Sequence, residues 1–275
     1  MNKENFDYNK IPPEGVFYNR MSASSHSRGH RYAPENTKSL LTWLEKKKKR
    51  IINNSRALEL EISKKEQYKE LKKFNIKFPK TYYANSKKEI IEKSKKFNKQ
   101  FITKHNRGGK GLGVKYFKNT LDLEKYVNES FEESVDGITL LQEYINSDPK
   151  VIKRVEFVKG KFLYAVQVDA SNGFELCPAD SCNTREKFCP TNPDGNKFMI
   201  IKDYKNIEIE KYENLLKSNG IEIAGIEYIK DKDGTHYTYD INTNTNYNPI
   251  AEERSNIKGM DSIANFLYNE LSRQN

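Results

Sequence analysis

A glycine-rich loop near the middle of the chain has the composition of a phosphate-binding site. Residues 106–113 contain four glycines: Gly108, Gly109, Gly111 and Gly113. Because glycine has no side chain, backbone N–H groups in such a loop can approach an anion closely. Three cations accompany the loop, Lys104 just before it and Arg107 and Lys110 within it. The pattern predicts a flap over phosphates, and the alternative is a hairpin tip that binds nothing.

This loop fits neither of the two common nucleotide-binding patterns. A Walker loop requires G-x4-G-K-S/T, which does not occur in the chain. A dinucleotide fingerprint that starts at Gly109 and Gly111 needs a third glycine where Val114 stands, and a helix after it. The sequence instead predicts two strands joined by the glycine loop.

Oxygen ligands alternate along a predicted strand near the C-terminus. Asp240, Asn242 and Asn244 fall on one face of that strand, and Glu227 lies on the strand before it. Carboxylate and amide oxygens suit Mg²⁺ when phosphates complete its coordination. Calcium is the competing ion because D-x-N-x-N begins an EF-hand loop, but the positions that need Gly and Glu hold Thr and Ala. An asparagine-rich turn without a metal is the other alternative.

A third segment has the composition of a pocket for a nucleobase. Gln142, Glu143, Tyr144 and Ile145 end an apolar stretch that begins at Ile138. Such a segment can hold adenine between apolar side chains and read its edge with backbone groups. By itself, the same pattern also fits an ordinary core strand.

Composition narrows the class of protein. The 275 residues are 36% hydrophobic, which supports a folded chain of one to three lobes. No apolar run reaches the roughly 18–20 residues of a membrane span, and Met1–Lys10 lacks the apolar run of a signal peptide. We therefore expect a cytoplasmic protein without membrane contact. The net charge of +10 comes mainly from lysine, and a general lysine bias explains it better than a nucleic-acid partner does.

Three cysteines gather in one loop. Cys177, Cys182 and Cys189 lack the C-x2-C spacing of structural zinc sites, and the four histidines are distant in sequence. An odd number of cysteines also argues against a secreted disulfide framework. We expect reduced thiols here.

The elements that must position these motifs form three segments. Residues 1–79 hold two short strands, a helix over 37–49, and a second helix that the capping pair Ser63 and Glu66 begins. Residues 80–149 hold a helix, the hairpin around the glycine loop, a helix and a strand. Residues 150–275 hold two strand pairs and two helices. This order predicts an α+β (α/β) fold. Lys64 begins the second helix, where the helix dipole disfavours a cation unless a phosphate lies nearby.

In this order, the motifs resemble the ATP-grasp superfamily, and within it the glutamate-adding ligases that modify ribosomal protein. The match runs from about Leu58 to the C-terminus. It consists of Ser63-Lys64 with Phe78-Pro79-Lys80-Thr81, Phe101-Ile102-Thr103-Lys104, the loop 107–114, Gln142-Glu143-Tyr144-Ile145, Lys153-Arg154-Val155-Glu156, and the pair Ala224-Gly225-Ile226-Glu227 and Tyr239-Asp240-Ile241-Asn242. The resemblance implies two α+β lobes that sandwich ATP, with a shortened N-terminal lobe.

The resemblance also implies roles for single residues. ATP would be bound by Lys64, Lys104, Arg107, Gly108, Gly109, Lys110, Gly111, Gln142, Glu143, Tyr144 and Ile145. Magnesium, with manganese as the alternative, would be held by Glu227, Asp240 and Asn242. Arg154 and Lys104 would be catalytic, with Arg154 stabilising an acyl phosphate. The implied reaction is ADP-forming ligation of a carboxylate to an amine, with an amino acid or a peptide as substrate.

Three departures from the family pattern matter. Glu227 stands where Asp is usual, and Asp240 stands where Glu is usual. Only about sixty residues precede Lys64, so acceptor binding is expected to be reduced or shared with a partner protein. The resemblance also allows a homodimer, although the sequence shows no interface signal. The loop Phe174–Cys189 is longer than expected and is a candidate substrate lid.

A donor-rich segment, residues 20–31, resembles the start of a subset of bacterial glutamate-ligase-like proteins. Arg28 and Arg31 in this segment are expected to contact a substrate carboxylate. Asn244, near the C-terminus, is a further expected substrate contact. The alternatives are a solvated loop and an arm that contacts nucleic acid.

Three other functions stay open at this point. A basic nucleic-acid-binding protein would bind DNA or RNA in a salt-dependent way, but no DNA- or RNA-binding motif is present. An ATP-grasp module can bind nucleotide without catalysis. An ATP-grasp kinase would give a stable phosphorylated alcohol and would need no amine.

Overall fold

The computed structural model describes residues 7–109, 111, 113–147, 150–170, 198–201 and 203–274. Lys110 and the cysteine-rich loop with its expected lid lie outside these residues. Within the described residues, no helix has the length and apolar content that crossing a lipid bilayer requires.

The N-terminal part is a small two-stranded unit wrapped by helices. Its elements are β1 (Val16–Tyr18), the 3₁₀ helix η1 (Ser25–Arg28), α1 (Ala33–Lys46), β2 (Arg50–Ile52), α2 (Ser55–Ile62) and α3 (Lys64–Lys73). Strands β1 and β2 pair in parallel. The Ser63 hydroxyl accepts a hydrogen bond from the backbone N–H of Glu66 and so caps α3.

Helix α1 begins four residues earlier than the expected start at Thr37. Pro34 lies in the first turn of the helix, where its missing N–H would have no intrahelical partner in any case. The helix ends at Lys46 instead of Lys49, and Lys48 then adopts a left-handed conformation with φ of 56°. Helix α2, which Asn54 caps, was not expected from the sequence.

The second part is a four-stranded antiparallel sheet with strand order β3-β6-β4-β5. Its strands are β3 (Thr81–Ala84), β4 (Phe101–His105), β5 (Lys115–Phe117) and β6 (Thr139–Glu143). Helices α4 (Lys87–Ser94) and α5 (Thr120–Glu129) pack on this sheet around Phe101, Leu123 and Leu141. The glycine-rich loop connects β4 to β5, as expected.

The third part is a five-stranded antiparallel sheet with strand order β11-β10-β7-β8-β9. Its strands are β7 (Val151–Val158), β8 (Lys161–Asp169), β9 (Phe198–Ile201), β10 (Ile223–Lys230) and β11 (His236–Asn242). Its helices are α6 (Glu208–Ser218), α7 (Pro249–Ser255) and α8 (Gly259–Ser272). Strand β9 and helix α7 were not expected from the sequence.

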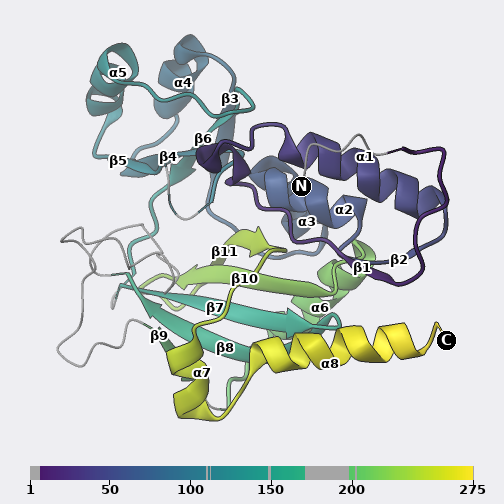
Figure 1. Ribbon diagram of the computed structural model, residues 1–275. Coiled ribbons are helices and arrows are strands. Elements are labelled where there is room, and N and C mark those ends of the chain that lie inside the picture. The colour runs from purple at the N-terminus through teal and green to yellow at the C-terminus, as the bar shows by residue number, and fades with distance from the viewer. Residues whose placement is uncertain are drawn as a thin grey trace.

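The large sheet forms the base on which the other parts rest. Figure 1 shows the small sheet with α4 and α5 at the upper left, the N-terminal helices at the upper right, and the large sheet below both. The main core joins α2, α3 and α6 to the large sheet and includes Tyr68, Leu71, Phe157 and Tyr212. Burial of each such side chain stabilises the fold by about 1.5–3 kcal/mol. The two sheets thus hold fixed positions on either side of one cavity.

Candidate functional site

A cavity of about 750 Å³ lies between the two sheets. Strands β4 and β6 line it from one side, and strands β7, β8, β10 and β11 line it from the other. The start of α3 and residues 22–24 close a further side. The predicted ATP-binding and metal-binding motifs therefore lie around one space, although they are far apart in sequence.

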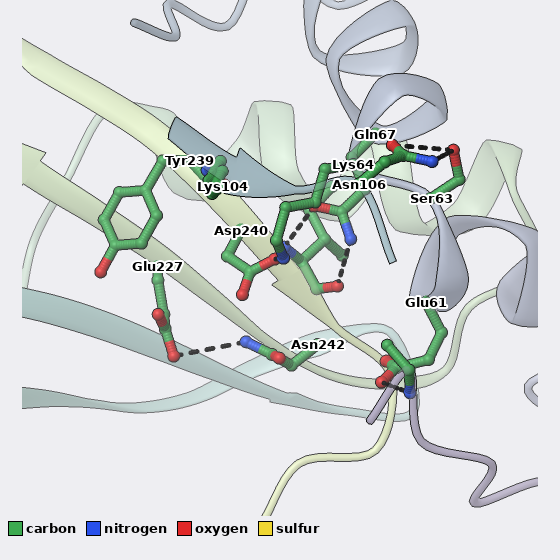
Figure 2. Close-up of polar contacts among 12 residues, drawn as sticks. Glu61, Ser63, Lys64, Gln67, Lys104, Asn106, Glu227, Tyr239, Asp240 and Asn242 are labelled. Carbon is green, nitrogen blue, oxygen red and sulfur yellow. Dashed lines mark hydrogen bonds and ion pairs between the residues drawn. The ribbon is translucent and has the colours of Figure 1, made fainter. Parts of the chain in front are cut away.

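Two lysines approach the cavity from different parts of the chain. Lys64 begins α3, and its ammonium forms an ion pair with Asp240 (Figure 2). Lys104 projects from β4 and is only 5% exposed. Its Nζ donates to the backbone carbonyl of Tyr239 at 3.4 Å. Burial and the nearby Lys64 charge lower the pKa of Lys104 to about 7. An anion bound here would stabilise the charged form of this buried amine.

Two carboxylates and one amide lie beside these lysines on the cavity wall formed by β10 and β11. Glu227 on β10 and Asp240 on β11 are direct partners in the strand register. Asn242, two residues further along β11, donates from its Nδ2 to Glu227 at 3.3 Å (Figure 2). Burial raises the pKa of Glu227, and the adjacent charge of Asp240 adds to the rise.

These residues fit Mg²⁺ and a polyphosphate together. The Nδ2 of Asn242 points to Glu227, so the Oδ1 atom remains as an acceptor beside two carboxylates. Two acids in direct register repel each other, and a divalent cation between them removes that repulsion. Lys64, which is paired with Asp240, and Lys104 lie next to these oxygens, so phosphate oxygens bound here would complete the charge balance. The donor set is the hard oxygen set that Mg²⁺ prefers.

The flap contributes its glycines to the cavity but not its arginine. Gly108, Gly109 and Gly111 line the cavity. Arg107 is not among the lining residues. Its guanidinium forms two hydrogen bonds with the carboxylate of Glu35 on α1, at 2.7 and 3.1 Å. The Arg107 bond holds the pKa of Glu35 below its usual value. The structure thus places Arg107 at the base of the flap, where it ties the flap to α1.

The expected adenine segment also lines the cavity. Gln142, Glu143, Tyr144 and Ile145 are all lining residues. The side chain of Gln142 is already occupied, because its Nε2 donates to the Tyr68 and Thr81 hydroxyls at 2.8 Å each. Two further lining residues, Ile102 on β4 and Ile229 on β10, bring apolar surface from the two sheets. A flat ring between the sheets would contact both.

Arg154 lies beside the acidic residues. It is opposite Glu227 in the pairing of β7 with β10. Its Nε is 2.6 Å from Glu156, and its Nη1 is 3.6 Å from Glu227. Burial opposes its charge, but these two carboxylates keep the pKa of Arg154 above its ordinary value.

Gly225 leaves the space in which Arg154 lies. A Cβ atom at Gly225 would come within 2.6 Å of the Arg154 Nε and 2.9 Å of a Glu156 oxygen. In the sequence, Gly225 stands out only as part of the motif Ala224-Gly225-Ile226-Glu227. The pairing of β7 with β10 shows why no side chain fits at position 225.

The expected substrate residues divide into two groups. Asn244 lines the cavity. Arg28 and Arg31 are exposed and are not lining residues. Arg28 donates to the Ser24 hydroxyl, and the guanidinium of Arg31 lies over the ring of Tyr32. From the same segment, Ser22, Ala23 and Ser24 are the residues that reach the cavity.

Two anchoring residues were not predicted from the sequence. Glu61 is buried and accepts hydrogen bonds from the backbone N–H groups of Ala23 and Thr243. Asn106, the first residue of the flap, accepts from the backbone N–H of Lys65 at 2.8 Å. Glu61 thereby joins the N-terminal segment to the end of β11, and Asn106 joins the flap to the start of α3. Asn54 is an N-cap residue for α2. This cap was the sequence signal that could have predicted the helix on which Glu61 lies.

No protein-family model matches the sequence, and no curated protein matches it significantly. Solved structures do match. The ATP-grasp ligase PsnB, complexed with a minimal precursor, has a TM-score of 0.62 at 14% identity over 92% of this chain and 78% of that chain. An ATP-grasp RimK domain protein from Sphaerobacter thermophilus has 0.60 at 12% identity, over 92% and 81%. D-alanyl-alanine synthetase A from Vibrio cholerae has 0.60 at 14% identity, over 87% and 74%.

Proposed function

Because the chain has the ATP-grasp fold, we propose that it is a Mg-ATP-dependent ligase that joins a carboxylate to an amine. The carboxylate would attack the γ-phosphate of ATP, which gives an acyl phosphate and ADP. The amine would then attack the acyl carbon, and phosphate would leave as the amide forms.

One observation carries this proposal. Lys64 and Lys104 converge with Glu227, Asp240 and Asn242 in a single cavity between the two sheets. Buried cations beside hard oxygen ligands are the environment that phosphoryl transfer requires. A protein that binds only nucleic acid would have no need for a buried glutamate and a partly buried aspartate in strand register.

The residues of the chain divide the work. Lys64, Lys104 and the glycines of the flap bind the triphosphate, and the segment from Gln142 to Ile145 holds adenine. Glu227, Asp240 and Asn242 hold Mg²⁺, which when bound neutralises charge on the phosphates and polarises the transferring group. Arg154 offsets the negative charge that develops on the acyl phosphate and on the tetrahedral intermediate. The enclosure between the two sheets limits access of water to the acyl phosphate.

We propose an amino acid or a peptide as the substrate class. Among similar structures, PsnB was solved with a minimal precursor, and a ligase from Chryseobacterium gregarium was solved with ADP and a leader and core peptide. A cavity of about 750 Å³ has room for a nucleotide and for part of a second molecule.

The experiment is a measurement of ADP release from Mg-ATP with a panel of amino acids and acidic peptides, each tested with and without an amine. ADP release that depends on both a carboxylate and an amine supports the ligase. Release with an alcohol alone would identify a kinase. ATP binding without release under any condition would identify a binding module and contradict the proposal.

A further inference from the structure

Asparagines follow one another at every second position where β11 ends. Asn242, Asn244, Asn246 and Asn248 all line the cavity. The first and last have assigned partners: Asn242 donates to Glu227, and Asn248 caps α7 by accepting from the N–H of Ala251 at 2.9 Å. Asn244 and Asn246 remain between them, and their amides are oriented by a residue from the other end of the chain.

That residue is Arg20, two residues after β1. Its Nε donates to the Oδ1 of Asn244 at 3.2 Å, and its Nη2 donates to the Oδ1 of Asn246 at 2.9 Å. Nη2 also donates to the backbone carbonyl of Thr245 at 3.3 Å. Arginine has only donors, so both amides must turn their oxygen atoms toward it. This fixes which end of each amide remains for a ligand.

The Nδ2 group of each amide, which is a hydrogen-bond donor, remains for a ligand. Among the described residues, neither the Nδ2 of Asn244 nor that of Asn246 has a hydrogen-bond partner. Because Arg20 donates to the oxygen of each amide, it polarises the amide and strengthens its N–H groups as donors. A ligand at this place is therefore met by N–H groups and must supply acceptor oxygens.

The charge distribution favours an anionic acceptor. Arg154 is already engaged by Glu156 and Glu227. Arg20 has no carboxylate partner among the described residues, and its guanidinium lies over the ring of Tyr18, 5.8 Å from the centroid. An unmatched cation behind two oriented N–H donors is complementary to a carboxylate.

We propose that Asn244 and Asn246 bind a carboxylate of the substrate through their Nδ2 groups, and that Arg20 is the residue that positions them. This inference rests on the proposed function, because it specifies how the ligase holds its acidic substrate. The substrate carboxylate is then recognised by two neutral amides next to the metal-binding strand, and Arg20 orients these amides without touching the substrate.

The test uses the full chain with Mg²⁺ and a non-hydrolysable ATP analogue. The probes are N-acetyl-L-glutamate and its uncharged counterpart N-acetyl-L-glutamine amide, which has the same skeleton without a carboxylate. The side-chain ¹⁵N–¹H signals of Asn244 and Asn246 report binding, and each is assigned from its loss in Asn244→Ala or Asn246→Ala. We expect both signals to shift with the acid and not with the amide. Arg20→Ala should weaken binding of the acid at least tenfold.

Two further variants separate positioning from folding. Arg56→Ala removes another arginine that forms several side-chain hydrogen bonds, but one outside the cavity lining, and it should bind the acid as the wild type does. Asn246→Asp keeps the acceptor for Arg20 but replaces the donor by a negative charge, and it should abolish binding. Wild-type affinity in Arg20→Ala, equal shifts with both probes, or no shift with the acid would each overturn the inference. Failure of the ligase proposal is read separately, from the absence of ADP release.

Discussion

Gln67 is expected to hold the metal-binding strand in place, and its replacement by leucine should show this. Gln67 is fully buried on α3. Its Nε2 donates to the carbonyls of Leu60 and Ile241 at 2.8 Å each, and its Oε1 accepts from the N–H of Ile241 at 3.0 Å. Strand β11 lies at the edge of its sheet, so the amide of Gln67 pairs with the free side of Ile241 as a neighbouring strand would.

The size of the effect follows from these bonds. Gln67→Leu keeps the volume of the side chain and removes three hydrogen bonds to buried backbone groups. Each net contribution is about 1 kcal/mol, and the buried leucine returns part of the loss. We expect the free energy of unfolding to fall by about 2–4 kcal/mol. Since Ile241 lies between Asp240 and Asn242, Mg-ATP binding should weaken as well.

Urea unfolding followed through the fluorescence of Trp43, the only tryptophan, measures the loss. Lys72→Leu is the matched control, because it introduces leucine at an exposed position of the same helix. Surface changes of this kind alter stability by less than about 0.5 kcal/mol. If Gln67→Leu is no less stable than Lys72→Leu, the strand is held by other contacts and the reasoning is refuted.

Three further predictions concern the site. Asp240→Ala combined with Asn242→Ala should reduce ADP release at least about a hundredfold, and a wild-type rate would disprove the metal assignment. The pKa of Lys104 is about 7 because the side chain is buried, and we expect it to rise when phosphate binds. The protein should therefore take up nearly one proton when it binds ATP at pH 8. Its affinity for ATP should fall as the pH rises above 7. Calorimetry in two buffers measures this uptake, which Lys104→Met should lose; equal uptake in both proteins contradicts it. Gly225→Ala should displace Arg154, because the added Cβ overpacks the site. We expect ADP release to slow about tenfold to a hundredfold, which corresponds to an activation free energy higher by about 1–3 kcal/mol. Unchanged turnover would show that Arg154 has room elsewhere.

The ATP-grasp fold was predicted from the sequence and is confirmed. Local signals sufficed for most elements: Ser63 caps α3, Gly220 follows α6 with φ of 62°, and Gly234 forms the turn of the β10–β11 hairpin. Strand β9 and helix α7 were missed. Each is short, and β9 is recognised only by its pairing with β8, which local periodicity does not record.

The limits of the site prediction have one physical cause. Spacing along a strand fixes which side chains share a face, so Asp240, Asn242 and Asn244 could be grouped from the sequence. It does not say which distant element lies opposite a loop residue. Arg107 in the flap was expected to meet phosphate and instead pairs with Glu35 on α1. The pairing of Arg20 with the asparagines after β11 has the same origin, because it joins residues more than two hundred positions apart.

The N-terminal part holds the metal-binding strand in place through several hydrogen bonds. The metal-binding strand β11 is an edge strand, and edge strands are free to shift or to pair with other chains. Three N-terminal residues fix it at successive points: Gln67 at Ile241, Glu61 at Thr243, and Arg20 at the asparagines beyond. A shift of one residue would turn Asp240 and Asn242 away from the cavity. These N-terminal contacts therefore help to hold the register of the metal ligands, and Gln67→Leu combined with Arg20→Ala should weaken Mg-ATP binding more than either change alone, even though Lys64, Lys104, Glu227 and Asp240 are all retained.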